Sequence, residues 1–424
     1  MSNILRTLNS IFRFSRIGGL FPFIIKKDGS IELSIILLII AFINQIILIT
    51  FVILIFLSRW VFVYYDINVM HESLLAVGQL AVQCAQITHL ISLVKHRKQL
   101  SDTFRQLKQM ESDDEPINTN ACFWYPTICS FILIGMPIVE AANTVYEFID
   151  IVAFILIIMK WELAYLGIFQ FTGLLSICRH CFKALNNKLN NSLSRYSKLE
   201  AMEKSERLIS CCETINRCYG PMLLIMLVSF FGLITTNLYA AYLQWTMKPL
   251  VVICVLNAII LFNTFRYLVK SCTTTANLAN QFNRDLYRLL FDEIVLSCGS
   301  RYSQSNITTI ETEDNLSEDN ESDNSLPPAL QKLIWQGSLA MEAINRKELE
   351  FTACGLFSIN YGLMCSMIET SATYLMICIQ FHDSMGIVTT RYEKTNYNND
   401  NNDNNNENVN DTMPQNSTEE YEID

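Results

Sequence analysis

Four side chains near the end of the last long apolar stretch combine the spacing of one helical stripe with the chemistry of a water-lined path. They are Thr373, Ile377, Gln380 and Ser384, at offsets of 0, 4, 7 and 11 residues. A glutamine within hydrocarbon has to hide its amide against protein or water. An apolar ring at Ile377 can close such a path by excluding water, and amide dipoles at Gln380 can replace part of an ion's hydration shell. The same face could instead pack inside one helix bundle.

Three glutamines form a second polar stripe in an apolar setting. Gln79, Gln83 and Gln86 stand at offsets of 0, 4 and 7, so a helix turns all three amides to one face. Such a stripe can hydrogen-bond a polyhydroxylated ligand, or it can bond neighbouring helices together. The sequence leaves both interpretations open.

Charged and aromatic residues lie at similar depths in two other apolar stretches. Glu140 is in one of them, and Lys160, Trp161 and Glu162 are in the next. An embedded lysine and glutamate are costly unless they are paired or hydrated, which favours a wet, ligand-binding cavity. The alternative is that these side chains reach toward the lipid headgroups, with Trp161 in the aromatic belt.

Fourteen cysteines are scattered without a framework spacing. Several residues could suggest zinc, but structural zinc needs four convergent ligands at a recognisable spacing; they are Cys178, His180, Cys181, Cys211, Cys212 and Cys218. We therefore expect reduced thiols near the membrane, no metal and no cofactor.

Seven apolar helices are predicted to position these side chains. The chain of 424 residues is 51% apolar and 17% charged, a composition typical of membrane proteins. A helix that crosses a bilayer needs about 20 mainly apolar residues. The stretches that qualify are 35–57, 73–94, 124–146, 151–177, 221–245, 250–269 and 354–381.

The distribution of basic residues predicts the orientation. Lys and Arg number 25 in the N-terminus and the loops after the second, fourth and sixth spans, against four on the other side. Loops rich in Lys and Arg stay in the cytosol. The fold class is therefore an all-α polytopic membrane protein with seven transmembrane helices, a cytosolic N-terminus and an extracellular C-terminus.

The end of the last span carries a family resemblance. Thr373 and Tyr374 are followed by five residues and then Gln380 and Phe381, which resembles the signature of the insect gustatory receptor family. The stretch Phe351–Asn360 is similar to the one that leads into the last span in the branch containing the fructose receptor. The chain departs from the family at Asn360, where an acidic residue is common, and in its long tail.

The resemblance implies a ligand-gated, non-selective channel for monovalent and divalent cations in the plasma membrane. It implies a homotetramer, or a heteromer with related receptors, whose last helices line one pore. The ligand is expected to be a small tastant (a sugar or a bitter compound) bound in the outer half of each helix bundle. Membrane lipid is the other expected partner.

These expectations divide the chain into five parts. They are a cytosolic N-terminus (1–34), a six-helix ligand-binding bundle with cytosolic extensions (35–269), a cytosolic segment (270–353), a pore-lining helix (354–385) and a disordered Asn-rich and acidic tail (386–424). The cytosolic segment contains a disordered acidic insert (297–325) and an anchor helix (329–351) that begins after two prolines.

Two other classes compete with the channel. A seven-helix G-protein-coupled receptor has its N-terminus outside, which reverses the charge distribution seen here. A small-molecule transporter is expected to show internal repeats and paired broken spans. The sequence has no Gly-rich phosphate loop, nucleophile elbow or His-Glu metal helix, so we predict no catalytic residues, no enzyme activity and no nucleic-acid partner.

Overall fold

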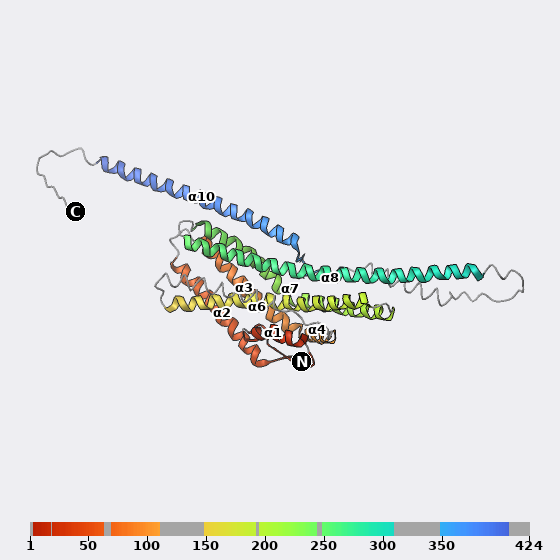
Figure 1. Cartoon of the computed structure of the whole chain (residues 1–424). Coiled ribbons are helices and arrows are strands. Elements are labelled where there is room, and N and C mark those ends of the chain that lie inside the picture. Colours follow the sequence, from red (N-terminus) through yellow and green to blue (C-terminus); the bar gives the residue numbers. More distant parts are fainter. Residues whose placement is uncertain are drawn as a thin grey trace, which may run out of the picture. The chain divides into compact units, whose positions relative to one another are not determined.

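The computed structural model describes residues 3–17, 19–62, 69–110, 148–191, 195–243, 248–308 and 348–406. These residues form helices and two short hairpins (Figure 1). The helices are α1 (Asn3–Ile17), α2 (Ile35–Phe62), α3 (Val69–Lys95), α4 (Arg97–Gln109), α6 (Phe148–Asn191), α7 (Arg195–Leu243), α8 (Lys248–Thr308) and α10 (Tyr361–Asn406). The strands are β1 (Phe23–Ile25), β2 (Ile31–Leu33), β3 (Thr352–Ala353) and β4 (Phe357–Ser358), which pair antiparallel as β1–β2 and β3–β4.

The chain divides into two compact units, Met1–Ser371 and Ala372–Asp424. The first unit holds the helix bundle, both hairpins and the first turns of α10. The second holds the rest of α10.

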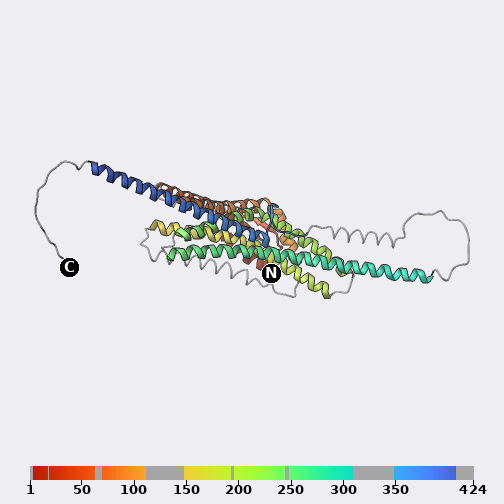
Figure 2. The same cartoon turned by 90° about the horizontal axis from the view of Figure 1, so that it is seen from above.

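The bundle of the first unit alternates in direction. The C-terminal ends of α2 and α7 lie at one end of the bundle, and those of α3 and α6 lie at the other (Figure 1). Seen from above, α6, α7 and α8 lie side by side (Figure 2), and each of the three packs against the other two. Helix α7 also packs extensively against α3, so α7 is the central helix.

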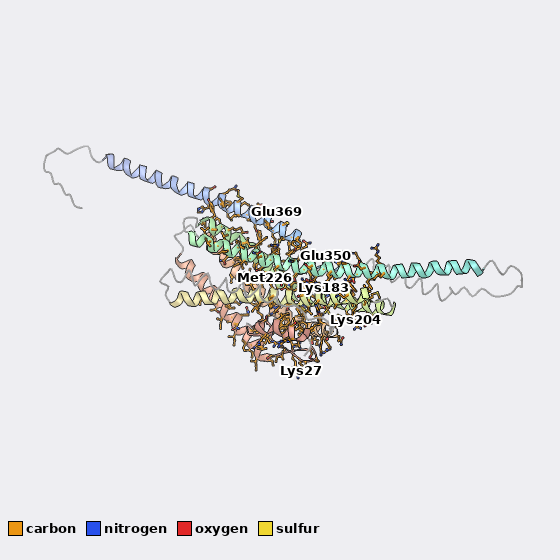
Figure 3. All side chains as sticks on the ribbon, in the orientation of Figure 1. Lys27, Lys183, Lys204, Met226, Glu350 and Glu369 are labelled. Atoms are coloured by element: carbon orange, nitrogen blue, oxygen red, sulfur yellow. The ribbon has the colours of Figure 1, made fainter. Side chains whose placement is uncertain are left out.

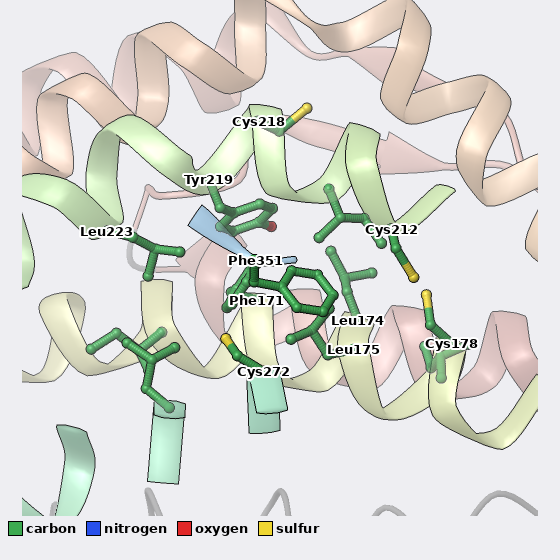
Figure 4. Close-up of a cluster of buried hydrophobic side chains, with 14 of the residues drawn as sticks. Phe171, Leu174, Leu175, Cys178, Cys212, Cys218, Tyr219, Leu223, Cys272 and Phe351 are labelled. Carbon is green, nitrogen blue, oxygen red and sulfur yellow. The ribbon is translucent and has the colours of Figure 1, made fainter. Parts of the chain in front are cut away.

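The core lies between these helices. Phe171, Leu174 and Leu175 of α6 face Tyr219 and Leu223 of α7, and all five are fully buried (Figure 4). The core continues to Cys272 of α8 and to Phe351, which precedes the β3–β4 hairpin. Core side chains thus join three helices to the chain that leads into α10.

Most of the predicted spans that the structure describes correspond to helices. Helices α2, α3, α6, α7 and α8 contain the first, second, fourth, fifth and sixth predicted spans, apart from the end of the fifth. The third span (124–146) lies outside the described residues. Among the described residues, two helical segments are long and apolar enough to cross a membrane, Glu200–Leu243 and Tyr361–His382. Shorter apolar helical segments are Ile35–Thr50 and Leu80–Lys95.

Three predicted boundaries are wrong. The last span was expected from Cys354, but residues 352–358 form the β3–β4 hairpin and the helix begins at Tyr361. The insert was expected to be disordered from 297, but α8 continues to Thr308. The tail was expected to be disordered from 386, but α10 continues to Asn406. The anchor helix lies largely outside the described residues, and its last four residues are not helical.

The sequence analysis did not predict structure in the N-terminal segment. Helix α1, the β1–β2 hairpin and α4 pack around an aromatic cluster of Phe12, Phe21, Phe23 and Phe104. The rings of Phe12 and Phe21 stack with centroids 3.9 Å apart, and Phe104 lies 5.6 Å from Phe12. The four buried positions of α4 follow helical spacing (Leu100, Thr103, Phe104 and Leu107), which is the signal that could have revealed it.

Candidate functional site

The predicted stripe of α10 is helical and exposed. Thr373, Ile377, Gln380 and Ser384 all lie within α10, and each side chain is exposed. The Ser384 hydroxyl donates a hydrogen bond to the Gln380 carbonyl oxygen at 2.7 Å, which satisfies that hydroxyl within the helix. Tyr374 and Phe381, the other motif residues, are 51% and 63% exposed. The helix therefore presents both its polar stripe and its motif aromatics outward.

Helix α10 begins at a capped turn. The Asn360 side-chain oxygen accepts the backbone N–H of Leu363 at 3.0 Å, which is the bond of an N-cap residue. An aspartate can accept the same bond. Asparagine and an acidic residue can therefore play the same capping role at this position.

The β3–β4 hairpin lies directly before that cap. Cys354 and Gly355 both have positive φ (54° and 76°), and the Leu356 N–H donates to the Ala353 carbonyl at 3.0 Å. This is a two-residue turn with the twist that hairpins favour. Gly355 adopts such φ values without strain, whereas Cys354 does so at some cost.

Two asparagines hold the strand side of the hairpin against the bundle. Asn280 of α8 accepts the Leu349 N–H at 2.8 Å and donates to the Leu349 carbonyl at 3.2 Å. Asn216 of α7 accepts the Thr352 N–H at 3.2 Å and donates to the Thr352 hydroxyl at 3.3 Å. Each amide thus bonds its partner residue through both its oxygen and its nitrogen, so the position of the strand is strongly specified.

The same turn of α7 touches the hairpin and the bundle interior. A Cβ added at Gly220 would meet the Cys354 backbone nitrogen at 3.3 Å, which is tighter than an ordinary contact, so a larger residue would have to push the hairpin away. On its other side, the turn carries Tyr219 and Cys218. We call residues 216–220 the α7 junction.

The α7 junction belongs to a buried polar network. The Tyr219 hydroxyl donates to the Gln170 side-chain oxygen at 3.1 Å, and His89 contacts that oxygen at 3.0 Å. The Ser92 hydroxyl of α3 donates to the Cys218 carbonyl at 2.7 Å. The side chains that make these bonds are all buried; they are Tyr219, Gln170, His89 and Ser92. The network joins α3, α6 and the α7 junction.

The glutamine stripe of α3 runs into this network. Gln83, Gln86, His89 and Ser92 follow one another at steps of three residues and are all buried. The Gln83 amide donates to the Gln45 side chain of α2, which is the helix-to-helix contact that the sequence offered as an alternative to ligand binding. His89 and Ser92 are the residues that the sequence analysis missed, although the continued spacing of the stripe could have found them.

The remaining ligand-binding candidates are only partly placed. Gln79 lies on α3, and Lys160, Trp161 and Glu162 lie on α6, but their side chains are not among those described. Glu140 lies outside the described residues. Their assignment as ligand contacts stays a prediction.

Comparison with known proteins identifies the family. The sequence profile described as 7tm Chemosensory receptor matches residues 8–308 and 338–385, which is most of the chain. The chain belongs to this chemosensory receptor family. The family comprises insect odorant and gustatory receptors, so the G-protein-coupled receptor and transporter alternatives are not favoured. A search of curated protein sequences found no match.

Solved chemosensory receptors share the fold. The insect olfactory receptor OR5 from Machilis hrabei in complex with eugenol is 13% identical, with a TM-score of 0.58, over 89% of this chain and 98% of that chain. A second structure of OR5 is 14% identical, with a TM-score of 0.56, over 89% and 97%. At this identity the likeness shows the fold alone, which is the helical architecture of the seven-span insect chemoreceptors.

Seven of the described cysteines of this chemosensory receptor are buried free thiols, whereas Cys84, Cys354 and Cys365 are exposed. Cys178 of α6 and Cys212 of α7 point toward one another (Figure 4). Their hydrogen bond, together with burial, raises the pKa of the Cys178 thiol. A thiol with a raised pKa is protonated and a poor metal ligand. Among the described residues, no three His, Cys, Asp or Glu side chains are arranged to hold a metal ion.

Proposed function

We propose that this chemosensory receptor is a gustatory receptor that works as a tastant-gated, non-selective cation channel of the plasma membrane. The proposal rests on the exposed α10 stripe of Thr373, Ile377, Gln380 and Ser384 together with the Thr-Tyr and Gln-Phe motif. Four copies of α10 around one axis would give an apolar ring at Ile377 and an amide ring at Gln380. The first ring gates by dewetting, and the second offers dipoles to passing monovalent and divalent cations.

The exposure of α10 supports assembly with other subunits. In the most apolar stretch of α10, 11% of the residues are buried within one subunit, against 61% in α7. A glutamine is unfavourable on a lipid-facing helix, because its amide would have no hydrogen-bond partner in the hydrocarbon. A shared pore gives Gln380 water, and neighbouring subunits cover the rest of the helix. The assembly is a homotetramer or a heteromer with related receptors.

The α7 junction offers a route from the ligand to the pore. The ligand is a small tastant, a sugar or a bitter compound, bound in the outer half of the bundle near Gln79, Glu140, Lys160, Trp161 and Glu162. Binding there shifts α3 and α6 relative to α7, and the His89–Gln170–Tyr219 network carries the shift to the junction. From the junction, Asn216 and Gly220 pass it to the hairpin that begins α10.

Current recording tests the proposal. The receptor is expressed in oocytes or cultured cells, tastants are applied, and single-channel conductance and ion permeability are measured. Gln380→Leu lowers conductance several-fold, because apolar groups replace the amide dipoles at the water path. Gln380→Ala changes the relative permeability of cations.

Leu375 provides the matched control. It lies on the opposite side of α10 from Gln380, so Leu375→Met leaves conductance and permeability unchanged. Native conductance in Gln380→Leu, or an equal effect of Leu375→Met, would contradict the assignment of Gln380 to the pore lining. Cytosolic exposure of an epitope tag at the C-terminus would contradict the orientation as well.

A further inference from the structure

A charged cleft lies between the β1–β2 hairpin and α4. It has a volume of about 480 Å³ and is lined by β2 on one side and by the first two turns of α4 on the other. Arg97, Lys98 and Ser101 are among its lining residues, with the acidic Glu32 and Asp102. We call this feature the β2–α4 cleft.

The walls of the β2–α4 cleft are held in place. The Ile31 N–H donates to the Ser101 hydroxyl at 3.1 Å, which joins β2 to α4 directly. The tip of the hairpin lies against α4 as well, since a Cβ at Gly29 (φ +90°) would meet the Arg105 Cα at 3.3 Å. Lys108 donates to the Lys27 carbonyl at 2.9 Å. The cleft is therefore formed before any ligand arrives.

The acidic residues of the cleft pair with neighbouring cations, whereas its two basic residues have no ion-pair partner among the residues that the structure describes. Glu32 pairs with Lys26 at 2.6 Å, and Asp102 pairs with Arg105 at 3.6 Å. Arg97 and Lys98 are exposed and make no ion pair with the described part of the chain. The cleft and its rim thus carry a positive charge that nothing described here neutralises.

The position of the cleft along the chain places it at the membrane surface. Strand β2 ends at Leu33, two residues before α2, and α4 begins two residues after α3 ends. Both walls are therefore next to predicted spans, on the side that the charge distribution assigns to the cytosol. The hairpin tip is visible at Lys27, at the edge of the unit (Figure 3). The surrounding segments 3–34 and 95–110 hold ten Lys and Arg residues against three Asp and Glu.

We propose that the β2–α4 cleft binds the phosphorylated inositol headgroup of an anionic lipid of the inner leaflet. Phosphate oxygens accept short, charge-assisted hydrogen bonds from guanidinium and ammonium groups, and Arg97 and Lys98 supply both kinds. Clusters of basic residues directly beside a membrane helix attract such lipids. A headgroup in the cleft would fix α4 and the β1–β2 hairpin at the membrane surface.

The test measures lipid binding to the full-length receptor, without using current. The receptor is placed in phosphatidylcholine nanodiscs with or without phosphatidylinositol bisphosphate, and bound lipid is measured by native mass spectrometry. The double variant Arg97→Ala with Lys98→Ala is expected to lower the affinity about 30-fold, from the loss of two cationic contacts near the surface. Because both side chains are exposed, the variant keeps the native melting temperature in phosphatidylcholine alone.

A second double variant controls for charge. Lys204→Ala with Arg207→Ala removes two exposed cations from α7, where they pair with Glu200 and Glu203. It keeps native lipid binding. Competition by soluble inositol trisphosphate would show that the headgroup alone is sufficient for binding. The absence of competition would show that the lipid must be in a membrane. Both outcomes support lipid binding by the β2–α4 cleft. Equal lipid affinity in the native receptor and the Arg97 and Lys98 variant, or equal losses in both double variants, would overturn it. A receptor that passes no current can still pass this test.

Discussion

Helices α7 and α10 are both apolar enough to cross a membrane, but they are used in opposite ways. Helix α7 buries most of its apolar stretch among α3, α6 and α8, while α10 leaves most of its own exposed. Threonine hydroxyls on both helices donate to their own backbone, as Thr236 does to Gly232 at 2.8 Å and Thr370 does to Ser366 at 2.7 Å. Local polar bonding therefore does not distinguish the two helices.

The difference in burial indicates different roles for the two helices. A central helix gains its stability from contacts inside one subunit, because lipid tails are as apolar as its own side chains and provide no hydrophobic driving force between helices. A helix that lacks such contacts needs partners from outside the subunit. The comparison therefore predicts that α7 governs folding and that α10 governs assembly and conduction.

Removing one phenylalanine from each helix should give the largest contrast. Phe230 of α7 is fully buried, and Phe381 of α10 is 63% exposed. Phe230→Ala leaves a cavity and destabilises the subunit by about 3 kcal/mol, near the low end for this change because an unfolded helix also rests in apolar lipid. Phe381→Ala changes subunit stability by less than about 0.5 kcal/mol. Thermal unfolding of the purified receptor measures both.

The same pair also separates folding from assembly. Native mass spectrometry should show fewer full assemblies for Phe381→Ala and a native subunit number for the Phe230→Ala protein that remains folded. Equal losses of stability from the two changes would mean that α10 is buried in its own subunit, and the comparison would fail.

Two glycines of α7 sharpen the comparison within one helix. Gly220 faces the hairpin, whereas a Cβ at Gly232 would meet nothing within 4 Å. Gly232→Ala should stabilise the receptor by about 0.5 to 1 kcal/mol, the usual gain within a helix. In Gly220→Ala, the tight contact between the new Cβ and the Cys354 backbone offsets this gain in stability. Gly220→Val destabilises the receptor by about 2 kcal/mol, because the larger side chain overpacks the same contact.

Ligand-evoked current distinguishes a coupling role of Gly220 from a purely structural one. If the α7 junction transmits the ligand's effect, Gly220→Val shifts the ligand concentration for half-maximal current, and Gly232→Val does not. A Gly220→Val receptor that is destabilised but activates at the native ligand concentration would limit the junction to a structural role.

The sequence predicted the spans because their signal is local. A run of about 20 apolar residues has few alternatives to a membrane helix, and five described helices contain runs that were predicted. The end of α8 was harder to predict, since this helix continues to Thr308, well past its apolar stretch. Hydrophobicity ends at the membrane surface, whereas backbone hydrogen bonding does not.

The β3–β4 hairpin before α10 was not predicted for a different reason. Residues 351–359 are apolar and lead directly into the last span, so an apolar count cannot separate strand from helix. The local signal was Gly355 at a turn position, which needs positive φ. The helical period of α10 was sufficient to find its polar stripe. The hydrogen bonds of Asn216 and Asn280 to the chain before α10 depend on which helices pack together, and no single stretch of sequence encodes that packing.

A local effect is expected at Asn360, where α10 begins. Asn360→Ala removes the acceptor for the Leu363 N–H and should cost about 1 kcal/mol. Asn360→Asp keeps an acceptor and adds a negative charge at the positive end of the helix dipole, so it should match or slightly exceed the native stability. Hydrogen exchange at the Leu363 amide measures the cap directly: it should be faster in Asn360→Ala and native or slower in Asn360→Asp. Faster exchange in both variants would show that α10 requires the asparagine's amide nitrogen, and an acidic residue could not then play the same role at this position. Unchanged exchange in both would mean that the hairpin, held by α7 and α8, fixes the start of α10 without its cap, and the stability of this helix would then depend on the bundle after all.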